Sequence, residues 1–264
     1  MITSNGNEKI KRVSSLLKKR RLREEERVFV CEGRKMYFEL LRQRPELLKE
    51  TYWSESGFAH LAPEERALAA QTEYELVADS VFERLAETVT PQGVCAVVGM
   101  PEHTLEEMLG DECRLILLER LQDPGNLGTI LRTAEAAGMT GVILSEDSVD
   151  AYNPKVVRST MGAIFRVPFL YAPSLPQVLQ TLAAQGVSVF AAHLAGSVSY
   201  DTVAYGKRYG ILIGNEANGL SDECTALAKQ AVRIPMYGQA ESLNAAVACA
   251  VLAYESRKPF EGEA

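Results

Sequence analysis

The chain of 264 residues is 47% hydrophobic and 24% charged, a composition typical of a soluble globular protein with two domains. It contains no apolar run of about 18 residues and begins with a polar segment, which argues against a membrane-spanning helix and a signal peptide and predicts a cytoplasmic protein. Its net charge of −7 argues against binding nucleic acid through overall charge. The five cysteines are scattered without a C-x-x-C pair, so we expect small core residues and no disulfide framework or metal site.

Basic residues are concentrated in the first two dozen positions, among them Lys18, Lys19, Arg20 and Arg21. Such a cluster can neutralise phosphates even on an acidic protein, because salt screening keeps its field local. Three glutamates follow at 24–26, so the run also fits a solvated helix face. Taken by itself, the run favours the solvated face.

The first hundred residues mix helices and strands. Helical spacing of apolar residues predicts helices over 10–17, 36–47 and 74–88. Short apolar runs predict strands at 27–33, 50–55 and 93–100, the last buried on both faces. The stretch 101–112 contains a proline, acidic residues and a glycine, which places a domain junction there. We therefore expect one domain over residues 1–105 and a second over residues 112–264.

The second domain alternates strands and helices more regularly. Strands are predicted at 114–121, 141–146, 166–171, 187–194, 209–215 and 231–236, with helices at 126–138, 153–163, 174–186, 221–230 and 242–255. This alternation predicts an α/β fold with a parallel sheet and helices on both faces. The last helix is apolar nearly all round, which indicates a buried position or a subunit interface.

Ligands of parallel α/β sheets bind beyond the carboxyl ends of the strands, where three loops of unusual composition lie. The first, at 121–138, places Asn126 and Gly128 at the start of a helix and Arg132 within its first two turns. An amide and a guanidinium near the positive end of a helix suit a phosphate group. Alternatively, Asn126 is an ordinary N-cap after an Asp-Pro-Gly turn, and Arg132 lies on the surface.

The second loop, at 212–221, spaces Gly214 and Gly219 like a phosphate-binding loop. Leu220 stands where such a loop carries its lysine, which argues against a Walker-type nucleotidase. Glu216 would repel a phosphate and suits a hydroxyl or a cation. The alternative is a tight glycine turn with an incidental acid. No G-x-G-x-x-G follows any strand, so the usual dinucleotide fingerprint is absent from the sequence.

The third loop runs from the last strand into the last helix, over residues 234–250. Backbone groups around Ile234, Met236 and Leu243 could read an adenine edge in an apolar slot. Ser242 and Asn244 stand at the start of the helix, where it would meet a ligand. Ser242 also fits the role of an ordinary N-cap.

Together and in this order, the three loops resemble the three sequence motifs of the SpoU (TrmH) family of RNA 2′-O-methyltransferases. The resemblance covers about residues 114–256, and residues 153–169 resemble the stretch that these enzymes carry between the first two motifs. The N-terminal hundred residues resemble the family's substrate-binding domain, which is similar to a small ribosomal-protein RNA-binding fold. This part of the resemblance rests on VFVCEGRKMYFELL and on the closing strand GVCAVV.

The resemblance implies a C-terminal domain folded as a deep trefoil knot, a feature that no periodicity would predict. It also implies a homodimer formed through the knotted domain, with S-adenosyl-L-methionine as the cofactor and RNA as the partner. An N-terminal domain beside the knot is more similar to the ribosomal-RNA branch than to the minimal transfer-RNA enzymes. We therefore expect a large-subunit (23S) rRNA substrate in preference to tRNA.

The resemblance also assigns roles to individual residues. The expected catalytic residues are Asn126, Arg132, Glu216, Ser242 and Asn244. The expected cofactor contacts are Leu194, Gly214, Asn215, Ile234, Met236, Leu243 and Asn244. The expected RNA contacts are Lys18, Lys19, Arg20, Arg21, Arg158 and Ser159, because an RNA substrate shifts the interpretation of the basic cluster towards phosphate contact.

For this family, Arg132 is the residue implied to act on the ribose hydroxyl. An arginine with a pKa above about 12 is a poor base at neutral pH. Our hypothesis is that Arg132 holds an RNA phosphate and polarises the hydroxyl, with the final proton acceptor left open. Two other classes stay open: a non-catalytic RNA-binding or ribosome-assembly protein, and a small-molecule enzyme with a nucleotide cofactor.

Overall fold

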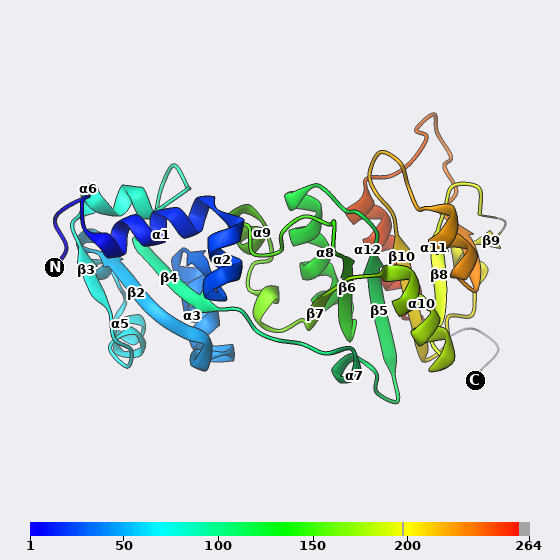
Figure 1. Ribbon diagram of the computed structural model, residues 1–264, viewed down its shortest axis with the longest axis horizontal. Helices are drawn as coiled ribbons and strands as arrows, with labels where there is room; N and C mark the ends of the chain where they lie inside the picture. The colour runs from blue at the N-terminus through cyan, green and yellow to red at the C-terminus, as the bar shows by residue number, and fades with distance from the viewer. Residues whose placement is uncertain (197, 259–264) are drawn as a thin grey trace. The chain divides into compact units, whose positions relative to one another are not determined.

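The computed structural model describes residues 1–196 and 198–258, and the chain divides into two compact units (Figure 1). Unit 1 comprises Met1–Pro101 and Asp150–Phe165, and unit 2 comprises Glu102–Val149 and the residues from Arg166 onward. The segment Asp150–Phe165 lies in sequence between the first two motifs, yet it packs with the N-terminal residues. The division expected from sequence assigned this segment to the second domain.

Unit 1 is built on a four-stranded sheet in the order β1-β4-β2-β3, in which only the β2–β3 pair is parallel. Its strands are β1 Val28–Glu32, β2 Leu48–Ser54, β3 Glu75–Val77 and β4 Val94–Gly99. Its helices are α1 Glu8–Lys18, α2 Arg20–Glu26, α3 Arg34–Gln43, α4 Glu55–Ala59, α5 Pro63–Ala69, α6 Asp79–Phe82 and α9 Pro154–Ser159, with 3-10 turns at Pro45–Leu47, Glu83–Leu85 and Ala163–Phe165.

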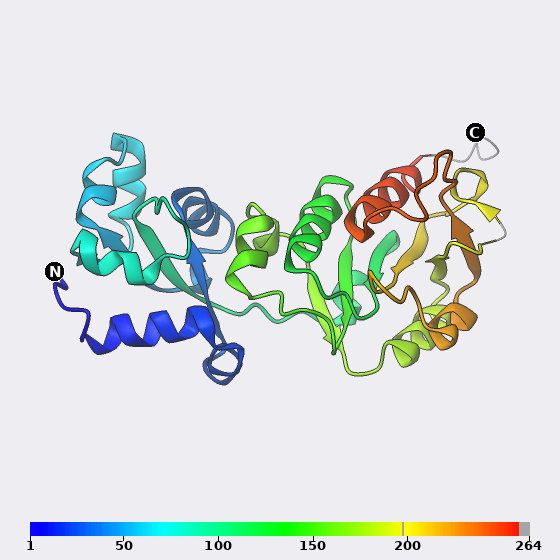
Figure 2. The ribbon, with the colours of Figure 1, turned by 90° about the horizontal axis from the view of Figure 1, so that it is seen from above.

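Helices cover both faces of this sheet, with α1 and α3 on opposite sides (Figure 2). The apolar side of α1 packs in one cluster with Tyr52 and Cys95. On the other side, Tyr37 and Phe38 of α3 pack against Trp53, the neighbour of Tyr52 on β2. Successive residues of a strand point to opposite faces, so the sheet separates the two helices.

Segment Asp150–Phe165 is attached to unit 1 by polar and aromatic contacts. Arg23 of α2, 3% exposed, forms a hydrogen-bonded ion pair with Asp150 and donates to the carbonyl of Leu16 at 2.6 Å. Phe29 of β1 packs against Tyr152 and Phe165, with ring centroids 5.0 and 6.3 Å apart. A buried charge needs such a partner, so this pair fixes where the segment begins.

Unit 2 contains a seven-stranded sheet in which every described neighbouring pair is parallel, in the order β7-β6-β5-β10-β8-β11-β9. Its strands are β5 Cys113–Leu118, β6 Gly141–Ser145, β7 Phe169–Ala172, β8 Ser188–Ala192, β9 Val198–Ser199, β10 Arg208–Ile213 and β11 Gln230–Arg233. Its helices are α7 Leu105–Met108, α8 Pro124–Ala136, α10 Leu175–Ala184, α11 Asp222–Leu227 and α12 Ala245–Glu255, with a 3-10 turn at Tyr200–Thr202. The predicted α/β fold with a parallel sheet is confirmed.

Helices α8 and α12 lie side by side on one face of this sheet, and α10 and α11 lie on the other (Figure 2). The α10–α11 face encloses a core that includes Leu115, Leu117, Leu179 and Leu212. The arrangement places the starts of α8 and α12, which carry the first and third motifs, close together. All five cysteines are buried and free, as the sequence predicted.

Two sequence predictions of helices were wrong in part. The predicted helix 74–88 begins with strand β3, because Leu76 and Val77 pair with β2, and only short helical turns follow. The predicted helix 153–163 ends at Ser159, since Met161 adopts φ 53° and Gly162 φ 98°, which a right-handed helix cannot continue. Among the helices in the described residues, none is long and apolar enough to cross a membrane.

Candidate active site

Three side chains from the three motif loops form a continuous chain of hydrogen bonds. Asn244 Nδ2 donates to Asn126 Oδ1 at 2.9 Å, and Asn126 Nδ2 donates to Glu216 Oε1 at 3.0 Å. Asn126 lies 90 positions from Glu216 and 118 positions from Asn244 in sequence. The structure thus brings Asn126, Glu216 and Asn244 into one cluster, and this contact joins the three motifs.

Glu216 is an acceptor for three N–H groups. Besides Asn126, the backbone amide of Asp123 donates to Oε1 at 3.0 Å and that of Gln122 to Oε2 at 3.1 Å. Burial raises the pKa of Glu216, but the hydrogen bonds from Asn126 and the backbone outweigh it, and the net effect lowers the pKa. Glu216 is therefore an ionised carboxylate that orders the first motif.

The two helix starts are capped by residues other than those considered from sequence. Asp123 caps α8 by accepting from the amide of Asn126 at 2.8 Å, so Asn126 is not the N-cap. Asn244 caps α12 by accepting from the amides of Ala246 and Val247, so the assignment of Ser242 as N-cap was wrong. The Asp-Pro pair at 123–124 carried the missed signal, because proline favours the first helical position directly after a cap.

A cavity of about 590 Å³ opens beside this chain, within the range of small-molecule sites. Its lining combines apolar side chains with loop backbone from β8, β10 and β11 outward. All seven expected cofactor contacts line it, and so do two of the other expected catalytic residues: Leu194, Gly214, Asn215, Ile234, Met236, Leu243, Asn244, Glu216 and Ser242.

Gly214 is required for the shape of this cavity. A Cβ atom at position 214 would lie 2.3 Å from the carbonyl carbon of Gly219 and 2.4 Å from the nitrogen of Leu220. The loop therefore folds back on itself only because position 214 has no side chain. Backbone hydrogen bonds of 3.0 and 2.9 Å between Asn215 and Gly219 close the turn.

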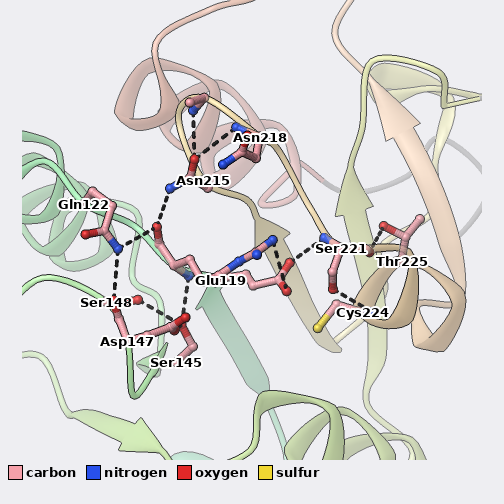
Figure 3. A network of polar contacts seen from close by, with 12 residues as sticks. Glu119, Gln122, Ser145, Asp147, Ser148, Asn215, Asn218, Ser221, Cys224 and Thr225 are labelled. Atoms are coloured by element: carbon pink, nitrogen blue, oxygen red, sulfur yellow. Dashed lines mark hydrogen bonds and ion pairs between the residues drawn. The ribbon is translucent and has the colours of Figure 1, made fainter.

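The side chain of Asn215 is used within the protein. Its Nδ2 donates to the carbonyl of Arg120 at 2.7 Å, and its Oδ1 accepts from the amides of Ala217 and Asn218 (Figure 3). Asn215 lines the cavity, yet its amide group orders the loop that carries Glu216. Sequence gave no indication of this task, since it depends on a carbonyl almost a hundred residues away.

A buried carboxylate fixes the other end of the same loop. Glu119, 7% exposed, accepts from the backbone amide of Ser221 at 2.8 Å, as Figure 3 shows. The next residue, Arg120, has φ 53° and donates its amide to Ser145 Oγ at 2.8 Å. A positive φ in a non-glycine residue costs about 1–3 kcal/mol and persists only where surrounding contacts impose it. Neither residue was singled out from sequence.

Arg132 lies apart from the cavity lining. It is exposed on α8 and forms no hydrogen bond or ion pair with any residue that the structure describes. Since an unpaired guanidinium offers five donors, Arg132 is available to a ligand. Ser242 is also exposed, at the edge of the cavity.

The expected RNA contacts lie in unit 1 and differ in their surroundings. Arg20 and Arg21 form ion pairs with Glu24 and Glu25 one helical turn away. The exposed side chains of Lys18 and Lys19 form no ion pair with any described residue.

In α9, Arg158 is half-buried and lies 3.7 and 3.6 Å from carboxylate oxygens of Glu32 and Glu87. The neighbouring Ser159 donates its hydroxyl to the carbonyl of Lys155 at 2.8 Å. Both side chains thus have partners inside unit 1.

Two family models match the chain. The SpoU rRNA Methylase family matches residues 114–254, and the MRM3-like substrate binding domain matches residues 7–96. The first match contains all three motif loops, and the second covers β1, β2, β3 and the first half of β4.

Known proteins are similar over nearly the whole chain. The chain is 34% identical to the 23S rRNA (guanosine(2553)-2′-O)-methyltransferase RlmP of Bacillus subtilis, over 97% of this chain and 98% of that protein. The AdoMet-bound rRNA methyltransferase from Sinorhizobium meliloti superposes with a TM-score of 0.87 at 33% identity, covering 97% of this chain and 96% of that one. The SpoU methyltransferase AviRb from Streptomyces viridochromogenes, in complex with AdoMet, gives 0.85 at 29% identity, covering 95% and 97%.

Proposed function

The chain belongs to the SpoU rRNA methylase family, and on this premise we propose that it transfers a methyl group from S-adenosyl-L-methionine to a ribose 2′-hydroxyl of 23S rRNA. The observation that carries the proposal is the hydrogen-bonded chain Asn244–Asn126–Glu216, which joins all three motifs beside a cavity of about 590 Å³. The presence of all three hydrogen-bonded residues argues against a non-catalytic RNA-binding or ribosome-assembly protein.

The cavity suits the cofactor by its chemistry. Ile234, Met236 and Leu243 provide an apolar slot, and the loops that carry them supply backbone donors and acceptors for an adenine edge. Gly214 keeps the loop backbone at the cavity wall, where a side chain would not fit. When bound, S-adenosylmethionine supplies an electrophilic methyl group on a sulfonium sulfur.

Residues of the three motif loops position the ribose hydroxyl that receives this methyl group. Glu216 and Asn244 hold Asn126 at the start of α8, and that helix carries Arg132. Arg132 binds an RNA phosphate in a bidentate manner and stabilises negative charge that develops on the ribose oxygen. Orientation of two bound reactants contributes roughly 7–11 kcal/mol to such a step. Ser242, exposed at the cavity edge, contacts the substrate.

The C-terminal unit forms a trefoil knot and dimerises through it. The strand order supports the knot. β10 lies between β5 and β8, the chain then forms β11 near the edge of the sheet, and it finally returns to place α12 against α8 and β10. Three exposed apolar side chains support the dimer: Val247 and Tyr254 of α12 are 49% and 55% exposed, and Leu243, just before the helix, is 37% exposed. A helix that is apolar nearly all round and has exposed apolar side chains fits a second copy of the chain.

Ribosomal RNA is favoured over tRNA because a match to a substrate-binding domain covers residues 7–96. The same match supports the proposal that unit 1 has a fold similar to a small RNA-binding ribosomal protein. It also supports the proposed RNA contacts, which are Lys18, Lys19, Arg20, Arg21, Arg158 and Ser159. We propose a cytoplasmic enzyme, a location that is compatible with an rRNA substrate.

Methyl transfer from radiolabelled S-adenosylmethionine to unmodified 23S rRNA, and separately to unmodified tRNA, tests the proposal. We expect label in rRNA as an alkali-resistant dinucleotide, lost in Arg132→Ala. Arg132→Lys should also lose most activity, because lysine cannot form the bidentate fork. Label in tRNA alone would move the substrate to tRNA. Bound cofactor without label in either RNA would favour the non-catalytic alternative.

A further inference from the structure

A second cavity, of about 630 Å³, lies in unit 1 on the α3 side of the sheet. Its walls come from one side of α3 along its length, from α4 and α5, and from the loop that precedes β4. Gly57 and Gly93 form its floor, where a Cβ on Gly57 would lie 2.6 Å from the Cα of Gly93. Gln92 Oε1 accepts from the amide of Arg34 at 2.9 Å and ties the loop to the helix.

The charge of this cavity is strongly biased. Three cationic side chains and one histidine line it, against a single carboxylate: Arg34, Lys35, Arg42, His60 and Glu65. Glu65 pairs with Arg34, which leaves an excess of positive charge at the rim. Lys35 is exposed and forms no ion pair with any described residue, and the side chain of Arg42 is 59% exposed with Glu39 at 3.6 Å.

The basic cluster at the N-terminus is the obvious competitor, and most of its charge is neutralised. Arg12 is hydrogen-bonded to Glu26 and Glu50. Arg20 and Arg21 pair with glutamates one turn away, and Arg23 is buried. The α3 cavity is an open hollow, and α1 lies on the other face of the sheet (Figure 2).

We propose that the α3 cavity is the principal phosphate-binding site of unit 1 and holds the sugar-phosphate backbone of the RNA substrate. The inference rests on the proposed function, which supplies an RNA substrate. Lys35 and Arg42 contact phosphates at the rim, and the guanidinium of Arg34, held in place by its ion pair with Glu65, offers its remaining N–H groups inside. A concave site suits a bent strand, since several cations converge on neighbouring phosphates.

The double variant Lys35→Ala/Arg42→Ala removes two exposed charges from this cavity. Its matched control, Lys49→Ala/Arg84→Ala, removes one lysine and one arginine that are exposed, lie outside both the cavity and the basic cluster, and form no ion pair with described residues. A third variant, Lys18→Ala/Lys19→Ala, tests the competing cluster. Binding to unmodified 23S rRNA is measured at several salt concentrations, together with S-adenosylmethionine binding, the melting temperature and the kcat and KM of methyl transfer.

In the cavity variant we expect the Kd for RNA to rise about tenfold and the slope of log K against log salt to fall by about 1.4–1.8, since each lost phosphate contact contributes about 0.7–0.9. The KM for RNA should rise, whereas kcat, the affinity for the cofactor and the melting temperature should stay unchanged. Equal behaviour of the cavity variant and its control would overturn the proposal, and so would a larger effect of the Lys18/Lys19 variant. Wild-type protein that methylates no RNA would instead refute the proposed function.

Discussion

At the scale of single residues, Glu216 is the acceptor on which the first two motifs depend. It accepts three N–H hydrogen bonds, from Gln122, Asp123 and Asn126. A carboxylate offers only acceptors, so each donor is satisfied. Glutamine at this position would turn an NH₂ group towards at least one of these donors.

We therefore expect Glu216→Gln to lower kcat of methyl transfer by about 10- to 100-fold, because loss of the acceptor displaces Asn126. Since Glu216 is exposed and solvent screens its charge, the loss of stability should be about 1 kcal/mol. A chain of this size would then melt about 2–4 °C lower at neutral pH.

The lowered pKa of Glu216 fixes the sign of the pH dependence. A carboxylate whose pKa is lower in the folded state stabilises the fold above its ordinary pKa, and this contribution is lost as the pH falls through the folded value. The difference in melting temperature between wild type and Glu216→Gln should thus be present at pH 7 and shrink below about pH 4.5. Glu73→Gln is the control, because Glu73 is exposed without a described partner. A difference that grew on acidification would contradict this account.

The residues of this cluster could be chosen from sequence, but their partners could not. Asn126, Glu216 and Asn244 stand in recognisable motifs. The amides that Glu216 accepts and the carbonyl of Arg120 that holds Asn215 belong to the backbone, which no side-chain pattern identifies. Glu119 was missed for a related reason, because its partner is the amide of Ser221.

At the scale of elements, Asn244 has two separable tasks. Its Oδ1 caps α12 through the amides of Ala246 and Val247, and its Nδ2 donates to Asn126. Aspartate keeps the capping oxygen but replaces the donor with a second acceptor.

We expect Asn244→Ala to lose about 0.5–2 kcal/mol of stability with the cap. Asn244→Asp should keep the wild-type melting temperature, because a carboxylate also suits the positive end of a helix. Both variants should lose at least about tenfold in kcat, since neither donates to Asn126. The measurements are thermal melts and methyl transfer on the same preparations. Wild-type activity in Asn244→Asp would show that the cap alone matters.

Periodicity predicted most elements and failed where the tertiary environment decides. The helices around Ile10 and Val13 and the strand 93–100 were confirmed, because their apolar spacing matches the face they bury. Residues 74–88 also show helical spacing, yet Leu76 and Val77 extend along β2. Three residues that complete a sheet edge are too few for an alternation signal to outweigh the helical pattern that follows.

At the scale of the whole molecule, the order of strands is the feature that local patterns could least predict. β10 lies between β5 and β8 in the sheet, although both of these strands precede it in sequence. The placement of Asp150–Phe165 with unit 1 is of the same kind, because it depends on contacts such as Arg23 with Asp150 across more than a hundred residues. Such contacts follow from the assembled fold, not from sequence spacing.

The open face of α12 leads to the last prediction. Val247 and Tyr254 are seven residues apart, so they lie along one side of the helix, and the exposed Leu243 directly precedes its N-cap. The opposite side, with Cys249 and Leu252, is already buried within unit 2. An apolar stripe of this length beside the cavity is the surface that the proposed dimer would cover.

We expect the wild-type protein to sediment at twice the mass of one chain, and Val247→Asp/Tyr254→Asp to sediment as a monomer, because two buried, unpaired carboxylates would oppose association. Val89→Asp is the control, since Val89 is fully exposed in unit 1 and far in sequence from this stripe. The monomeric variant should retain a cooperative thermal transition, because the altered side chains lie outside the core of its own unit. A wild-type protein that sediments as a monomer at all concentrations would exclude the dimer, and an unchanged dimer in the double variant would place its interface elsewhere.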